Sequence, residues 1–204
     1  MKIVNLKQAK KHQIEVVFDE MSVFLDKETV LKNALKVGKD LSEPEIETLK
    51  YDSQKTRATS KALWLLGLRE YSKKEMFLRL VKDGFEREAS SEVVETLADS
   101  GVIDDERFAY NYAYNLHINR HLGKRAIITE LVLKGVSREI AEHYANEFCN
   151  DEVADAANII RIKYKGFNTD EKINRRMFAG LQRKGYSYST IKSAMDLVES
   201  EESF

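Results

Sequence analysis

The sequence predicts a mainly α protein in which a small β-hairpin and short helices precede three tandem three-helix repeats of the helix-turn-helix kind, arranged as an elongated chain. Three observations support this prediction. One proline and 33% charged residues among 204 favour helices with short connections. Apolar residues follow a helical period almost without a break from Ser60 onward. One apolar pattern that ends in glycine occurs three times, at offsets of 51 and 50 residues.

The N-terminal segment, residues 1–57, differs from the rest of the chain. Ile14, Val16 and Phe18 alternate with Glu15, Val17 and Asp19, and the mainly apolar run 21–25 follows a two-residue turn, which predicts a hairpin. Residues 29–37 favour a short helix that ends near Gly38. The sequence Ser42-Glu43-Pro44 supplies the cap and first-turn proline of another helix.

The repeated pattern marks the central helix of each repeat. Apolar residues at i, i+1, i+4 and i+5 form one buried stripe, and the glycine supplies a left-handed residue that ends the helix. The third copy replaces one apolar position with a polar one. The copies are Met76-Phe77-x-x-Leu80-Val81-x-x-Gly84-Phe85, Ile127-Ile128-x-x-Leu131-Val132-x-x-Gly135-Val136 and Met177-Phe178-x-x-Leu181-Gln182-x-x-Gly185-Tyr186.

Each central helix is flanked by two further helices, as apolar residues at helical spacing indicate. The capping box Ser72-x-x-Glu75 agrees with these boundaries. A unit of about 50 residues buries too little surface to be robust alone, so neighbouring repeats are expected to share contacts. The boundaries that we expect are 1–57 for the extension and 58–102, 103–150 and 151–204 for the repeats.

Composition narrows the functional classes. The 33 basic and 34 acidic residues leave a net charge of -1, so the chain as a whole does not attract nucleic acid or an anionic membrane. A single cysteine, Cys149, permits no internal disulfide, and the start of the chain does not look like a signal peptide. No apolar run approaches the ~20 residues that span a bilayer. We therefore expect a cytoplasmic protein.

Motifs of catalysis are missing from the sequence. It has no glycine-rich phosphate loop, no G-x-S-x-G and no HExxH, so we predict a protein that is not an enzyme and uses no cofactor. Three weaker alternatives stay open. His117 and His121 could form a metal pair on one helical face, although a partly exposed helix end explains them as well. Cys149 fits a buried apolar residue or a catalytic thiol. Asp104-Asp105 fits helix capping or a carboxylate pair.

Tyrosines alternate along the helix that begins the second repeat. Tyr112 is expected to face the core, whereas Tyr110 and Tyr114 point elsewhere. Exposed aromatic side chains can stack on bases, and they can also pack between repeats, which is the interpretation that we favour.

Charge is distributed unevenly along the repeats. Residues 57–82 hold seven bases and two acids, residues 120–134 four bases and one acid, and residues 161–184 eight bases and two acids. The third helices are the reverse: 88–99, 137–149 and 189–199 together hold nine acids against Arg138 and Lys192. A helix that reads the major groove needs Arg, Lys, Asn or Gln facing the bases, so sequence-specific recognition by these helices is disfavoured.

Three stretches carry a resemblance to a known family: Leu66-x-x-Arg69-x-Tyr71-Ser72-x-x-Glu75-x-x-x-x-Leu80-x-x-x-Gly84, Gly101-Val102-Ile103-Asp104-Asp105-Glu106-Arg107-Phe108-Ala109 and Leu131-x-x-Lys134-Gly135-Val136. They resemble successive motifs of the RecX family, and the second stretch is the most specific. The resemblance covers about residues 58–198. The hairpin and the helices after it are similar to the N-terminal extension of Gram-positive-type members.

The resemblance implies a regulator that binds the RecA recombinase filament on DNA and mainly inhibits recombination and ATP hydrolysis, in DNA repair and the SOS response. No motif of the family assigns a catalytic residue. Because the chain is nearly neutral, we expect its contact with DNA to be weak and without sequence preference, and we expect a monomer. A transcription regulator of helix-turn-helix type is the alternative, and a nuclease or hydrolase that uses scattered carboxylates is a third.

The predicted contact residues all lie in the three basic segments, which follow the junctions between first and second helices. On this hypothesis they touch the filament protein or DNA phosphates. The residues are Arg69, Lys73, Lys74, Lys124, Arg125, Lys163, Arg175, Arg176, Arg183 and Lys184.

Overall fold

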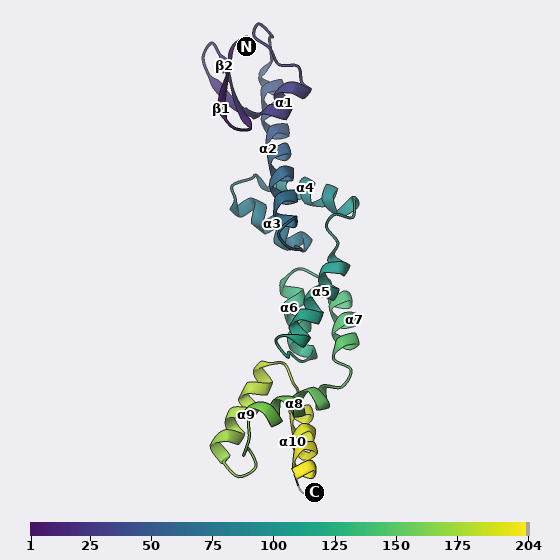
Figure 1. The fold of residues 1–204 in the computed structure, drawn as a ribbon. Helices are drawn as coiled ribbons and strands as arrows, with labels where there is room; N and C mark the ends of the chain where they lie inside the picture. Colours follow the sequence, from purple (N-terminus) through teal and green to yellow (C-terminus); the bar gives the residue numbers. More distant parts are fainter. Residues whose placement is uncertain (203–204) are drawn as a thin grey trace. The chain divides into compact units, whose positions relative to one another are not determined.

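The structure is a computed structural model that describes residues 1–202, in which helices follow a small N-terminal sheet (Figure 1). The mainly helical fold class is confirmed. The chain forms two compact units, unit 1 over Met1–Asp104 and unit 2 from Asp105 onward. The elements are β1 (Ile3–Lys10), β2 (Gln13–Phe18), β3 (Ser22–Asp26), α1 (Lys27–Lys32), α2 (Glu43–Leu66), α3 (Lys73–Lys82), α4 (Arg87–Asp99), α5 (Asp105–Ile118), α6 (Lys124–Leu133), α7 (Arg138–Phe148), α8 (Glu152–Lys163), α9 (Glu171–Arg183) and α10 (Tyr188–Glu202).

The N-terminal sheet has three antiparallel strands in the order β1-β2-β3. The predicted hairpin is β2 and β3, and the N–H of Phe18 donates to Met21 O at 2.8 Å across its turn. The sequence pattern missed β1. Its register with β2 shifts between Ile3 and Asn5 and again between Gln8 and Lys10. These irregularities break the two-residue alternation on which the prediction of strands depends.

The helices of the extension differ from the expectation of short elements. α1 is shorter than the predicted helix over 29–37, because the chain turns through Ala34, whose φ is +46°. α2 is longer, with 24 residues, and begins at the predicted cap Ser42, whose backbone N–H donates to Glu45 Oε2 at 2.7 Å. Its N-terminal half packs on the sheet, while its C-terminal half is the first helix of repeat 1. The predicted boundary after residue 57 thus falls inside one continuous helix.

Buried side chains form four clusters in the described part of the chain. One joins the sheet to the start of α2 over residues 3–49. The others lie within the three-helix segments, over 58–103, 108–149 and 156–198. The two long side chains of the repeated stripe are fully buried in every copy: Met76 and Leu80, Ile127 and Leu131, Met177 and Leu181. The periodicity therefore identified the core of each repeat, and the exact domain boundaries stay a prediction.

The glycine that ends each central helix has a left-handed backbone, with φ of +93° at Gly84, +93° at Gly135 and +94° at Gly185. Gly185 has a further role inside unit 2. A Cβ placed on it would lie 2.5 Å from the backbone nitrogen of Ala126 in α6, so the two repeats approach each other closely here. The N–H of Gly123 also donates to Lys184 O at 2.8 Å. Backbone contacts therefore join repeats 2 and 3.

None of the helices over residues 1–202 is long and apolar enough to cross a membrane. The same residues contain no group of three or more His, Cys, Asp or Glu side chains arranged to hold a metal ion.

Candidate functional site

Repeat 1 contains the first three predicted contact residues. The Arg69 guanidinium lies 3.6 Å from the centre of the Tyr71 ring and donates to Glu75 Oε2 at 3.1 Å. Lys73 Nζ lies 3.0 Å from Glu95 Oε2. Lys73 and Lys74 are the first residues of α3, where the helix dipole disfavours positive charge. Arg69 and Lys73 thus already pair with carboxylates, whereas the Lys74 side chain is exposed.

Repeat 2 places cations in the same position of its central helix. Lys124 and Arg125 begin α6, and its first turn holds no acidic residue. The N–H of Lys124 donates to Glu152 Oε1 at 2.9 Å, so a carboxylate of α8 already occupies part of this helix end. The Arg125 side chain is exposed, and that of Lys124 is half-buried.

Unit 2 gathers six basic side chains where repeats 2 and 3 meet, and we call them the cationic cluster. The bond from Gly123 to Lys184 brings the start of α6 to the end of α9. Arg125 and Arg183 line one shallow depression together. Lys184 Nζ donates to the main-chain oxygen of Arg120. The members are Arg120, Lys124, Arg125, Lys163, Arg183 and Lys184.

The electrostatics of the cluster favour an anion. Burial lowers the pKa of Lys184, and the neighbouring charges of Lys163 and Arg120 lower it further. Cations that repel one another in this way are stabilised by an added negative charge. Arg120 is absent from the predicted contacts, although it opens the basic segment 120–134. The count of basic residues in segment 120–134 included Arg120, but only the fold shows that Arg120 lies close to Lys184.

The remaining two predicted residues lie on α9. Arg175 pairs with Glu171 one turn earlier, and both side chains are exposed. Arg176 and Arg183 are seven residues apart and share one face of the helix, where both are exposed. None of the ten predicted cations is buried, so all have surface that a partner can reach.

The third helices carry the acids that the sequence places there. The first turns of α4 and α7 contain Glu88 and Glu139, and α10 ends in acidic residues. Lys73 and Lys55 of neighbouring helices pair with acids of α4, namely Glu95 and Glu92. These surfaces repel phosphate, in contrast to the cationic cluster.

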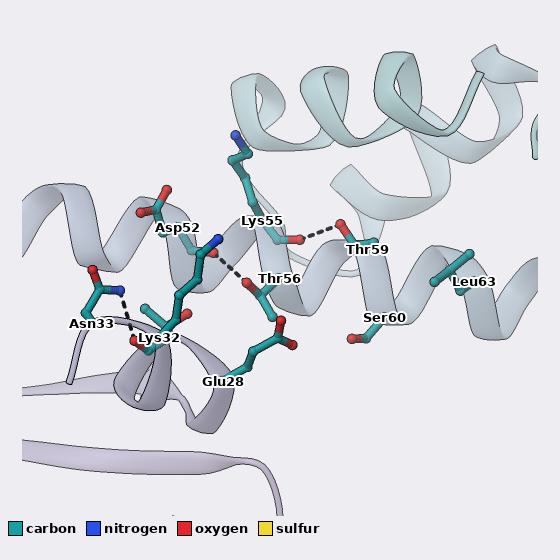
Figure 2. A pocket seen from close by; sticks show the side chains of 10 residues that line it. Glu28, Lys32, Asn33, Asp52, Lys55, Thr56, Thr59, Ser60 and Leu63 are labelled. Carbon is teal, nitrogen blue, oxygen red and sulfur yellow. Dashed lines mark hydrogen bonds between the residues drawn. The ribbon is translucent and has the colours of Figure 1, made fainter. Parts of the chain in front are cut away.

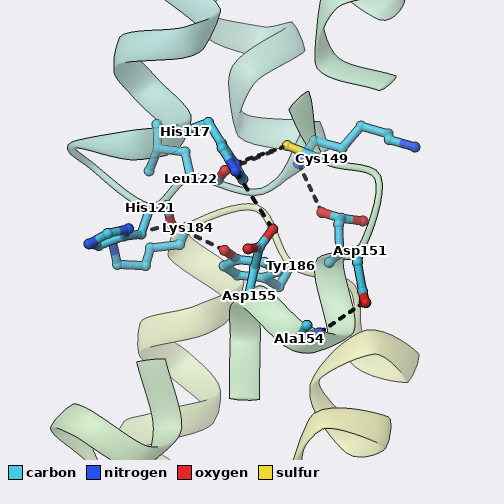
Figure 3. Close-up of polar contacts among 11 residues, drawn as sticks. His117, His121, Leu122, Cys149, Asp151, Ala154, Asp155, Lys184 and Tyr186 are labelled. Carbon is cyan, nitrogen blue, oxygen red and sulfur yellow. Dashed lines mark hydrogen bonds and ion pairs between the residues drawn. The ribbon is translucent and has the colours of Figure 1, made fainter. Parts of the chain in front are cut away.

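His117 lies between two side chains of unit 2, the Cys149 thiol and the Asp155 carboxyl (Figure 3). Its Nδ1 is 3.6 Å from Cys149 Sγ, and its Nε2 is 3.9 Å from Asp155 Oδ2. For the metal pair that the sequence left open, both imidazoles line one cavity of unit 2, but His121 lies beyond the end of α5 with a left-handed φ of +52°. The two imidazoles therefore do not share a helical face.

Cys149 is a buried apolar residue rather than a nucleophile. Its side chain is 2% exposed, and burial, followed by the charges of Glu152 and Asp155, raises the pKa of its thiol to about 12. A reactive cysteine needs an accessible thiolate. The arrangement of Cys149, His117 and Asp155 therefore resembles a catalytic triad only in its residue types.

The tyrosines of α5 pack within their own repeat. Tyr112 faces the core as predicted and stacks on Phe108, with ring centres 5.4 Å apart. Tyr110 and Tyr114 contact Phe148 of α7 edge to face, at 5.2 and 5.7 Å. The expectation that these two tyrosines pack between repeats is corrected, because the contacts found are with α7 of repeat 2.

Asp104-Asp105 precedes and starts α5, whose first turn contains Asp105 and Glu106. Negative charge at a helix start agrees with the structural interpretation of this pair.

Unit 1 has a polar pocket of about 470 Å³ between α1 and α2 (Figure 2). Glu28, Lys32, Asp52 and Lys55 supply equal numbers of acids and bases to its lining. Thr29 Oγ1 is buried there and has no hydrogen-bond partner in the described chain. Lys55 already pairs with Glu92 at 2.6 Å. The pocket contains none of the predicted contact residues.

Family comparisons match the repeats. A family described as "RecX, first three-helix domain" matches residues 58–97, and "RecX, second three-helix domain" matches residues 104–144. A protein named Regulatory protein RecX from Listeria monocytogenes serotype 4a (strain HCC23) is 30% identical over 202 residues, which are 97% of this chain and 75% of the relative. This chain belongs to the RecX family. A RecX from Streptococcus pneumoniae serotype 19F (strain G54) is 26% identical over 98% of this chain and 78% of its own.

Solved RecX structures share the fold. A crystal structure of a regulatory protein RecX matches with a TM-score of 0.70 and 18% identity, covering 96% of this chain and 98% of the other. RecX from Lactobacillus salivarius matches with a TM-score of 0.62 and 20% identity, covering 72% of this chain and 97% of the other. The RecX relatives are named as regulatory proteins, which agrees with a chain whose candidate site is a charged surface.

Proposed function

We propose that this RecX family member regulates the RecA recombinase by binding along the RecA filament on DNA, and that it mainly inhibits recombination and ATP hydrolysis. The observation that carries the proposal is the cationic cluster. Six basic side chains from two repeats gather in unit 2, while the third helices carry acids. Such a surface suits DNA phosphates or an acidic face of the filament.

The mechanism that we propose is steric and electrostatic. Arg125 and Arg183 lie on the exposed part of the cluster, and neither forms an ion pair with another described residue. Their positive charge is thus available to a partner. Arg69, Lys73 and Lys74 of repeat 1 and Arg175 and Arg176 of α9 extend the contact. A chain bound in this way resists the rearrangements that filament turnover requires.

Recognition of phosphates by this surface does not depend on base sequence. The acidic third helices lack the side chains that read the major groove, so we expect little discrimination between duplexes. A transcription regulator would instead bind its own site roughly 10³-fold or more tighter than random DNA.

Co-sedimentation of the full chain with preformed RecA filaments on single-stranded DNA tests the proposal. Binding should fall about tenfold or more between 50 and 200 mM salt, because cations that contact phosphate release counterions. Naked duplexes of random and selected sequence should bind weakly and equally. Failure to sediment with filaments at low salt, or strong preference for one duplex, would refute it.

A further inference from the structure

A second cavity of unit 2 lies beside the cationic cluster. It has a volume of about 360 Å³ and lies where the end of α5 meets α8 and the loop before α10. Asp155, Asn158, Ile159 and Ile162 are spaced at i, i+3, i+4 and i+7, so one face of α8 forms most of its wall. Part of this wall is visible in Figure 3, where Asp155 lies close to His117 and Tyr186.

The mouth of the cavity is apolar. Ile118 from α5 is 46% exposed and Ile162 from α8 is 70% exposed, and both line the same opening. Ile159 lies deeper, with 5% exposure. Large aliphatic side chains that line one opening from two helices suit a flat, largely apolar body that can insert between them.

The lining of the cavity also includes polar groups that offer acceptors. The Asp155 carboxyl has one ion-pair partner within residues 1–202, the distant His117 nitrogen at 3.9 Å. No hydrogen bond to the Asn158 amide occurs among these residues either, and that amide is exposed. Burial raises the pKa of Asp155, whereas the neighbouring imidazoles of His117 and His121 act in the opposite direction. A ligand group with N–H donors would satisfy this carboxylate.

The rim of the cavity is cationic. Lys163 is part of the lining, and its charge acts on Lys184, whose pKa the charge of Arg120 also lowers. The cavity therefore offers an apolar slot, a carboxylate acceptor in its lining and positive charge at its rim. A flat base, an amino donor on that base and an anionic phosphate occur together in a nucleotide.

We propose that this cavity binds a single nucleotide, with its base between Ile118 and Ile162, its exocyclic amino group donating to Asp155 and its phosphate near Lys163 and Lys184. The inference rests on the proposed contact with DNA and adds a base-binding site to it. Bases that carry an exocyclic amino group, such as cytosine, are preferred over thymine, which has none.

The test measures fluorescence anisotropy of the full chain with three labelled oligomers of equal length and charge: oligo-dC, oligo-dT and an abasic oligomer. Oligo-dC should bind about tenfold tighter than the abasic strand, because only the base can enter the slot. Ile162→Ser should remove this difference and leave abasic binding unchanged. Asp155→Ala, which removes the acceptor, should abolish the preference for dC over dT.

Val132→Ser is the matched control, because Val132 is also an exposed aliphatic residue of unit 2 but lies outside the cavity. It should leave all three affinities within about twofold of the unmodified chain. Equal affinity of the unmodified chain for oligo-dC and the abasic strand would overturn the inference, as would equal effects of Ile162→Ser and Val132→Ser.

Two further measurements separate the sources of the ligand and the two proposals. If free deoxycytidine monophosphate displaces the labelled oligomer at the same nucleotide concentration as unlabelled oligomer, the cavity binds free nucleotides. If only the unlabelled oligomer displaces it, the cavity binds single strands. Filament binding without base discrimination would refute the cavity and leave the proposed function intact. Base discrimination without filament binding would refute the proposed function alone.

Discussion

Gly185 combines two constraints at one residue: a left-handed backbone and a close approach to α6. Gly185→Ala should therefore destabilise unit 2 strongly. A left-handed residue with a Cβ costs about 1–2 kcal/mol. The new Cβ would also lie 2.5 Å from the Ala126 nitrogen, so the repeats must separate. Urea unfolding should show a loss of more than about 2 kcal/mol.

Gly84→Ala provides the control, because Gly84 has nearly the same φ of +93° and an added Cβ would meet no atom within 4 Å. It should lose only the backbone contribution, about 1–2 kcal/mol. Equal losses for the two variants would show that the contact between Gly185 and Ala126 does not hold the repeats together.

The Cys149 thiol should resist alkylation in the folded protein. Its burial and its raised pKa of about 12 leave almost no accessible thiolate at pH 8. Because the folded pKa is raised, ionising the thiol is unfavourable in the folded state, so stability falls as pH rises toward that value. Iodoacetamide labelling followed by mass spectrometry should be slow in buffer and fast in urea. Rapid labelling in buffer would contradict the buried position.

Single residues show where sequence reasoning reaches its limit. The burial of Cys149 and the inward position of Tyr112 were predictable. The position of His121 outside α5 was not, since it depends on α5 ending at Ile118 and on the positive φ of His121. The cavity beside Asp155 was not predicted either, because the residues that line it come from two repeats that no local sequence pattern connects.

At the scale of elements, the cap of α3 should contribute measurably to unit 1. Ser72 Oγ accepts from the N–H of Glu75 at 3.1 Å and is fully buried. Ser72→Ala should lower the free energy of unfolding by about 1 kcal/mol, as the loss of N-caps does. Ser60→Ala, at an exposed position inside α2, should change it by less than about 0.5 kcal/mol. Chemical denaturation of both variants measures the difference.

Helices and strands were predictable to the extent that their periodicity is regular. The three central helices followed from the stripe and its terminal glycine, both of which are local. β1 was not predicted, because its bulges interrupt the alternation of apolar and polar residues and because Ile3 is its only buried side chain. The length of α2 was not predicted, because its two halves pack in different hydrophobic cores. No single apolar stripe therefore continues along its 24 residues.

At the scale of the whole molecule, family membership agrees with the repeat architecture. Basic segments far apart in the sequence, 120–134 and 161–184, meet in unit 2 because backbone contacts join Gly123 to Lys184. The charge of both segments could be counted from the sequence. That they lie at one surface could be seen only in the fold. The central claim is that this meeting creates the surface that contacts the filament.

Inhibition of RecA ATP hydrolysis on single-stranded DNA by charge-reversed variants tests that claim most directly. Arg125→Glu with Arg183→Glu changes two cluster residues, and Arg138→Glu with Lys192→Glu makes the same change of charge on the third helices α7 and α10. Both variants should melt within a few degrees of the unmodified chain. The account predicts that half-inhibition needs about tenfold more of the first variant, a difference of about 1.4 kcal/mol, and less than about twofold more of the second. Equal inhibition by the two variants would contradict it.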